Sequence, residues 1–185
     1  MTLADSAARA PTPSQTVGPF FRFGFEWLAG GELVHRHDPQ ALSIVGRVLD
    51  GVGDPVPDAV VEVWQADRHG QLASEAEPGW RGFARLLTDP GGAFELVTVK
   101  PGAVPGPHGQ PQAPHIDVSV FARGLLQRLM TRIYFPDEAT ANAADPLLAR
   151  LDPSERATLV AHPGTDRLVF DIHLQGDAET VFLAW

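Results

Sequence analysis

Residues 113–124, APHIDVSVFARG, alternate apolar and polar side chains, as a β-strand with one buried face does. Side chains of a strand point to opposite faces in turn. One face would carry Ile116, Val118, Val120 and Ala122, and the other His115, Asp117, Ser119, Phe121 and Arg123. The apolar face predicts a core. The polar face fits solvent, a cavity or an interface, and Phe121 in its midst slightly favours an interface.

The chain around this strand has the composition of one soluble globular domain. It has 185 residues, of which 44% are hydrophobic and 20% charged. A net charge of −9 argues against nucleic acid and anionic membranes as partners. The absence of cysteine excludes disulfides and cysteine-ligated zinc. We see no signal peptide and no apolar run of transmembrane length, so the sequence predicts a cytoplasmic protein.

Short strand-like segments recur along the chain and are separated by glycine and proline turns. The segments are residues 43–50, 59–67, 81–89, 93–102, 113–124, 129–135, 167–176 and 180–185. The turn Asp-Pro-Gly-Gly at 89–92 predicts a hairpin. A helix is predicted over 152–162, with Asp152 as N-cap and Glu155 completing a capping box. We therefore predict an all-β fold, an antiparallel β-sandwich with one or two short helices.

The N-terminal segment differs from the rest and predicts an arm over residues 1–28, ahead of a domain over 29–185. Residues 1–15 are small and polar, whereas residues 16–28, TVGPFFRFGFEWL, hold four phenylalanines and a tryptophan. Gly18 and Pro19 interrupt any regular element there. So many aromatic rings need a protein surface to cover them. The arm can lie on its own domain or insert into a neighbouring chain, and composition modestly favours the first.

The pair His115-x-Asp117 could belong to a metal site. Together with His162 or His173 it matches the two-histidine, one-carboxylate set of Fe(II) oxygenases. The alternative is that the histidines are packed or surface residues, which is the more common finding on strands. Tyr134, the one tyrosine in the sequence, is expected to be buried with a bonded hydroxyl.

Five motifs in order make the chain resemble the intradiol ring-cleavage dioxygenases. They are TPSQTVGPF (12–20), VEVWQAD (61–67), TVKPG (98–102), APHIDVSVFARG (113–124) and TRIYF (131–135). The resemblance implies a prealbumin-like β-sandwich. It also implies that catalytic subunits of this family hold Fe(III) with two tyrosinates and two histidines. The corresponding positions here are Leu72, Val104, His115 and Asp117, so three of the four ligands are missing.

The same resemblance implies an α-type subunit without iron, which works beside an iron-bearing β subunit in a higher-order α–β hetero-oligomer. The implied reaction is cleavage of 3,4-dihydroxybenzoate (protocatechuate) by O2. Thr16, Gly18 and Pro19 of the arm would lie over the iron of the β subunit. Arg123 would either bind the substrate carboxylate or hold the subunits together. A transthyretin-like binding module without enzyme activity is a further alternative.

Overall fold

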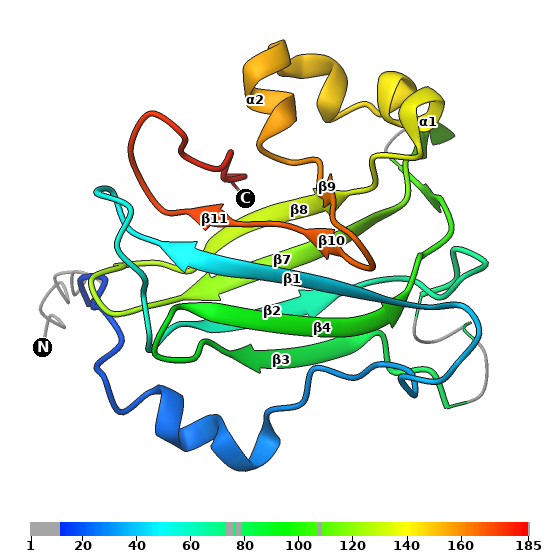
Figure 1. The fold of residues 1–185 in the computed structure, drawn as a ribbon. Coiled ribbons are helices and arrows are strands. Elements are labelled where there is room, and N and C mark those ends of the chain that lie inside the picture. Colours follow the sequence, from blue (N-terminus) through cyan, green and yellow to red (C-terminus); the bar gives the residue numbers. More distant parts are fainter. Residues whose placement is uncertain (1–11, 73–75, 77–78, 107–108, 185) are drawn as a thin grey trace, which may run out of the picture.

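A computed structural model describes residues 12–72, 76, 79–106 and 109–184, and its strands form two sheets that face each other (Figure 1). One sheet has four strands in the order β3-β2-β7-β8, all antiparallel. Their bounds are β2 Val60–Trp64, β3 Phe83–Leu87, β7 His115–Phe121 and β8 Leu129–Tyr134. β7 in this sheet is the strand predicted within residues 113–124.

The other sheet is built around the long strand β1 and is mixed. β1 pairs antiparallel with β4 and parallel with β10 and β11, and β9 adds to β10. The bounds are β1 Ala41–Leu49, β4 Ala93–Val99, β9 His162–Pro163, β10 Leu168–Val169 and β11 Ile172–His173. A small separate ribbon pairs β5 Val104–Pro105 with β6 Pro111–Gln112.

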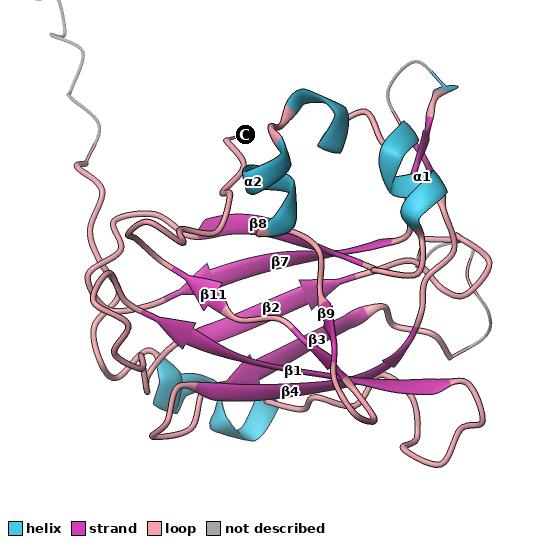
Figure 2. Ribbon diagram, turned by 45° about the horizontal axis from the view of Figure 1, so that its top comes forward, coloured by secondary structure: helices cyan, strands magenta, loops and turns pink. Residues whose placement is uncertain are grey.

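The helices are short and lie outside the sheets (Figure 2). Those within the described residues are the 3-10 helices η1 Arg22–Leu28 and η3 Leu148–Arg150, and the α-helices α1 Ala139–Ala144 and α2 Pro153–Ala157. α1 and α2 lie beyond β8, whereas η1 lies on the opposite side of the molecule near β3. In the part of the chain that the structure describes, no helix has the length and apolar content needed to span a bilayer.

The core lies between the two sheets, and the predicted apolar face of β7 is at its centre. Its residues are almost fully buried and include Ile116, Val118, Val120 and Ala122. From the other sheet, Ile44, Val48, Leu96 and Ile172 pack into the same cluster. The opposite face of β7 is only partly open, since His115 and Ser119 are also buried. The predicted antiparallel sandwich is confirmed.

The turn at 89–92 is tight, but the predicted hairpin is wrong. Asp89 accepts hydrogen bonds from the amides of Gly91 and Ala93, and Gly92 has a φ of 73°. The strands on either side do not pair with each other, because β3 pairs with β2 and β4 pairs with β1. The turn therefore crosses from one sheet to the other.

The capping prediction for α2 is confirmed, whereas the last predicted strand is not. The carboxylate of Asp152 accepts from the amide of Glu155 at 2.9 Å, and the Glu155 carboxylate accepts from the Asp152 amide at 2.9 Å. Residues 180–184 form no strand in the described part of the chain, although the Leu183 amide donates to the Met130 carbonyl.

One face of η1 packs on the domain and its other face is exposed. The ring of Phe21 lies 5.6 Å from that of Phe121, and the ring of Phe25 lies 4.2 Å from the guanidinium of Arg85. On the outer side, Phe20 and Trp27 are each 78% exposed. In this chain the arm contacts its own domain and still presents large aromatic rings, so packing of the arm on a partner subunit stays a prediction. Residues 1–11 of the predicted arm lie outside the described residues.

Candidate functional site

A pocket of about 510 Å³ opens at one end of the four-stranded sheet. His115 and Asp117 enter it from the start of β7, Trp64 from the end of β2, and Arg132 from β8. The full lining is Trp64, Gln65, Ala66, Leu72, Arg81, Gly82, Val104, Pro105, Gln112, His115, Asp117 and Arg132. All four positions that the family resemblance singled out, Leu72, Val104, His115 and Asp117, line this one pocket.

His115 is held as a neutral ring. Its Nδ1 lies 2.7 Å from the Ala113 carbonyl oxygen, which can only accept, so Nδ1 carries the proton. Burial, together with the positive charge of Arg132, lowers the pKa of His115 below its ordinary value of about 6.5. The Nε2 lone pair lies 3.8 Å from Oδ1 of Asp117. Two acceptors therefore lie next to each other at the pocket wall.

Arg132 forms an ion pair with Asp117 in the wall of the pocket. Its Nε donates to Oδ1 of Asp117 at 2.8 Å, and its Nη1 donates to Oε1 of Gln112 at 2.6 Å. The arginine is nearly buried and faces Asp117 directly, because these two residues are partners in the β7–β8 register. Asp117 thus has a protein-supplied counterion.

Tyr134 lies beside this pair, and its predicted structural role is confirmed. It is fully buried, and its hydroxyl donates to Oδ1 of Asp145 at 3.2 Å. Burial raises the pKa of Tyr134, so the phenol stays protonated. Asp145 also accepts from the backbone amides of Ala113, Leu147 and Leu148. The tyrosine is therefore part of a buried network that fixes the start of β7 and of η3.

The donor set of the pocket does not fit an iron ion. The side chains of Leu72 and Val104 have no donor atom, and Asp117 already binds a guanidinium that a trivalent cation would have to displace. His115 Nε2 is left as one ligand, which is too few. Within the described ranges, no group of three or more His, Cys, Asp or Glu residues is placed to hold a metal ion.

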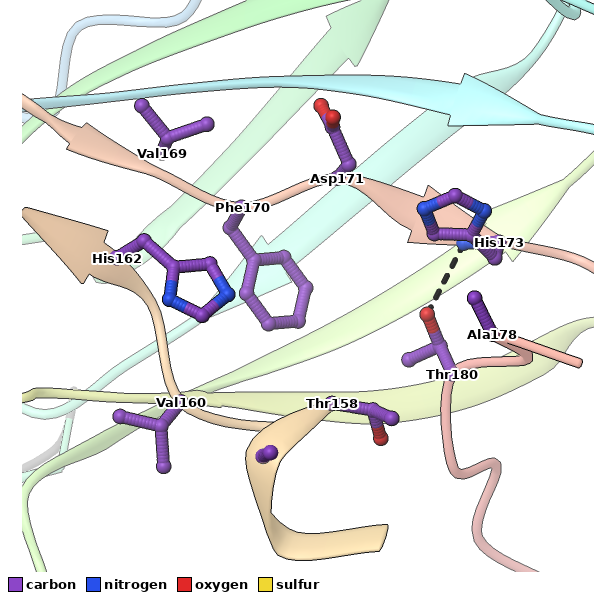
Figure 3. Close-up of a pocket in the computed structure, with 10 residues that line it drawn as sticks. Thr158, Val160, His162, Val169, Phe170, Asp171, His173, Ala178 and Thr180 are labelled. Atoms are coloured by element: carbon purple, nitrogen blue, oxygen red, sulfur yellow. Dashed lines mark hydrogen bonds between the residues drawn. The ribbon is translucent and has the colours of Figure 1, made fainter. Parts of the chain in front are cut away.

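The alternative Fe(II) set of His115, Asp117 and His173 is not brought together. His173 lies on β11 in the other sheet, where its amide donates to Thr180 Oγ1 at 3.0 Å (Figure 3). It lines another pocket, with His162, Phe170 and Asp171. Asp171 there pairs with Arg47 at 3.1 Å. The spacing in the sequence was compatible with the set, but the strands belong to different sheets.

The remaining predicted residues gather at the other end of β7. Thr16 Oγ1 accepts from the amide of Gly124 at 2.8 Å, which brings the arm next to Arg123. Arg123 Nε lies 2.9 Å from Oδ2 of Asp58, and the rest of its side chain is largely exposed. A Cβ on Gly18 would meet nothing within 4 Å, and Pro19 is exposed. These residues form an open surface rather than part of the pocket.

Sequence reasoning did not single out Trp64, Arg81, Gln112 or Arg132 as pocket residues. Arg132 could have been found, because antiparallel pairing of 113–124 with 129–135 places a basic residue opposite Asp117. Arg81 and Gln112 come from segments far apart in the sequence and have no comparable local signal. Their positions follow from the tertiary fold.

Comparison with known proteins agrees with this fold. The dioxygenase family model (Dioxygenase_C) matches residues 32–176. The chain is 41% identical to the protocatechuate 3,4-dioxygenase alpha chain of Pseudomonas putida, over 92% of this chain and 94% of that one. It is 37% identical to the protocatechuate 3,4-dioxygenase beta chain of Burkholderia cepacia, over 70% of this chain and 55% of the beta chain.

A solved structure shares the architecture. The dioxygenase domain of a dioxygenase–carbohydrate-binding protein fusion from Streptomyces sp. SirexAA-E superposes with a TM-score of 0.61 at 27% identity. The match covers 80% of this chain and 88% of that domain. Fold, motif order and sequence similarity agree with one another, and the chain belongs to the intradiol ring-cleavage dioxygenase family.

Proposed function

We propose that this chain is the non-catalytic alpha-type subunit of a protocatechuate 3,4-dioxygenase and that a beta subunit supplies the Fe(III) site. The observation that carries the proposal is that the pocket of this chain lacks the side chains needed to bind iron. Two ligand positions are aliphatic, and a third, Asp117, binds Arg132. The 41% identity to an alpha chain over nearly the full length of both proteins supports the same role.

In this proposal the complex uses O2 to cleave 3,4-dihydroxybenzoate between its two hydroxylated carbons. The product is 3-carboxy-cis,cis-muconate, and both oxygen atoms enter it. Our chain contributes shape and charge from the surface that carries Thr16, Gly18, Pro19 and Arg123. Its partner holds the iron, and the α–β units assemble into a larger cytoplasmic hetero-oligomer.

The surface around Arg123 has the properties this role requires. Only Nε of the guanidinium is bonded to Asp58, and among the described residues its two Nη groups have no hydrogen-bond partner. A guanidinium with free Nη groups can bind a carboxylate in bidentate fashion. Gly18 has open space around it in this chain, which leaves room for a second protein or a substrate to approach the backbone.

The exposed side of η1 supports a neighbouring subunit. Phe20, Phe23 and Trp27 are large apolar residues that are more than half exposed, and they follow directly on the Thr16–Pro19 segment. Aromatic side chains of this kind are enriched at protein interfaces. We therefore place the beta subunit against the outer side of the arm.

Steady-state kinetics of the complex test the role of this surface. Replacing Arg123 by Gln should raise KM for protocatechuate about tenfold with a smaller effect on kcat, because a charged hydrogen bond to the carboxylate is lost. Arg47→Gln is the matched control, since Arg47 is an exposed arginine that also pairs with an aspartate. An unchanged KM in Arg123→Gln, with weakened assembly instead, would assign Arg123 to the subunit interface.

A further inference from the structure

The pocket that contains His115 and Asp117 has the size of a small-molecule site. Its volume of about 510 Å³ lies within the range of about 300–1,000 Å³ that is usual for small-molecule sites. Its apolar wall is made by Trp64, Ala66, Leu72, Val104 and Pro105. His115, Asp117 and Arg132 line it from β7 and β8, and Arg81 lines it from the segment before β3. A few polar groups placed around an apolar wall can orient a small ligand.

Counted over the described residues that line it, the pocket carries a net positive charge, although the protein as a whole is acidic. Arg132 and Asp117 neutralise each other at 2.8 Å, and His115 is neutral. Arg81 also lines the pocket, and its guanidinium makes no hydrogen bond or ion pair with any of the residues described. Among the described residues, Arg81 is therefore a cation without a partner, in a chain whose net charge is −9. A cation of this kind favours an anionic ligand.

The shape of the pocket favours a flat ligand. Trp64 is 51% exposed, and its ring packs 4.4 Å from that of Phe83, which holds the indole in place. A rigid indole that is half open to a pocket provides a surface on which a planar group can stack. Asp117 and Nε2 of His115 present acceptor atoms, which offer a carboxylate no hydrogen-bond donor. The anionic group of a ligand is therefore directed towards Arg81.

From these features we propose that the pocket binds a small planar carboxylate, of the size of benzoate, without acting on it chemically. The carboxylate would pair with Arg81 and the ring would lie against Trp64. Neither the reaction nor the subunit role proposed above is needed for this inference. It adds a binding function to positions at which the iron ligands of the family are missing.

Calorimetric titration of the full chain with sodium benzoate tests the proposal, using two isosteric or near-isosteric variants. Arg81→Gln should weaken benzoate binding about tenfold, because the ion pair with the carboxylate is lost. Asp117→Asn should tighten it several-fold, because a negative charge leaves the wall. Arg81 is exposed, so its replacement should leave the fold intact. If the chain purifies with a partner, the same variants are made in the complex.

Arg150→Gln provides the control, since it removes an equally exposed positive charge outside the pocket. It should bind benzoate like the unmodified chain. Benzyl alcohol, which has the ring without the charge, should bind at least about tenfold more weakly than benzoate. The proposal is overturned if benzoate does not bind, if Arg81→Gln binds it as tightly as the unmodified chain does, or if benzyl alcohol binds as tightly as benzoate.

Discussion

Arg132 and Asp117 form an ion pair of 2.8 Å across the register of β7 and β8, in the wall of the pocket that Leu72, Val104 and His115 also line. Asp117 is 40% exposed at its side chain, whereas Arg132 is almost buried. Asp117 therefore faces the open part of the pocket, and Arg132 lies behind it in the protein interior.

Loss of the arginine should destabilise the domain. In Arg132→Met the carboxylate of Asp117 and the amide oxygen of Gln112 lose a charged donor, and we expect the free energy of unfolding to fall by about 2–3 kcal/mol. Urea unfolding measures this. Arg128→Met, at an exposed position on the loop before β8, should change it by less than about 0.5 kcal/mol. Equal stability of both variants would show that the pair is not structural.

Asp145 should be among the most sensitive polar positions. It is fully buried and accepts from three backbone amides and from the Tyr134 hydroxyl. In Asp145→Asn one oxygen becomes a donor that faces another donor, which should cost about 2 kcal/mol or more. Thermal and urea unfolding check the loss, with the exposed Asp177→Asn as control. A loss below about 0.5 kcal/mol would contradict the proposed network.

His115 should make stability depend on pH below neutrality. Its pKa in the folded chain lies below that in the unfolded chain, so the unfolded state takes up the proton first as pH falls. The contribution is present above about pH 6.5 and is lost as the pH drops through the lower folded pKa.

A variant that cannot titrate isolates this effect. His115→Asn keeps an N–H that can donate to the Ala113 carbonyl but has no imidazole to protonate. Between pH 7 and pH 5 the unmodified chain should lose more stability to urea than this variant does. Parallel losses in the two proteins would assign the acid sensitivity to other groups.

The two sides of the arm should respond differently to mutation. Trp27→Ala, on the exposed side, should leave the unfolding free energy within about 0.5 kcal/mol and weaken association with the beta subunit. Phe21→Ala removes the contact with Phe121 and should detach the arm at a cost of about 1 kcal/mol. Sedimentation with a co-expressed beta subunit and urea unfolding measure the two effects. Unimpaired assembly of Trp27→Ala would exclude this surface as the interface.

Features set by residues close together in the sequence, such as a buried strand face or a helix cap, were predicted correctly. The alternation of Ile116, Val118 and Val120 predicted the buried face of β7, and Asp152 with Glu155 predicted the start of α2. The turn after Asp89 was recognised, but its sequence does not say whether the flanking strands pair with each other or cross between sheets. The crossing follows from Leu86 and Leu96, which enter the same core from opposite sheets.

In the pocket too, residues close together in the sequence were predictable and residues from distant segments were not. His115 and Asp117 are two residues apart on one strand, so their shared face was predictable. Arg81 lines the same pocket from the segment before β3. It lies more than thirty residues from His115 in the sequence, so no local pattern indicates that the two share a pocket. His173 was a plausible third ligand in sequence, and only the assignment of β11 to the other sheet excludes it.

The iron content of the isolated chain, purified from iron-replete cells and compared with the chain co-purified with a beta subunit, decides whether the reactive centre belongs to another polypeptide. We expect no stoichiometric iron and no visible tyrosinate-to-iron absorption in the isolated chain, and both in the complex. One ferric ion per isolated chain, retained through desalting and lost in His115→Asn, would contradict this account.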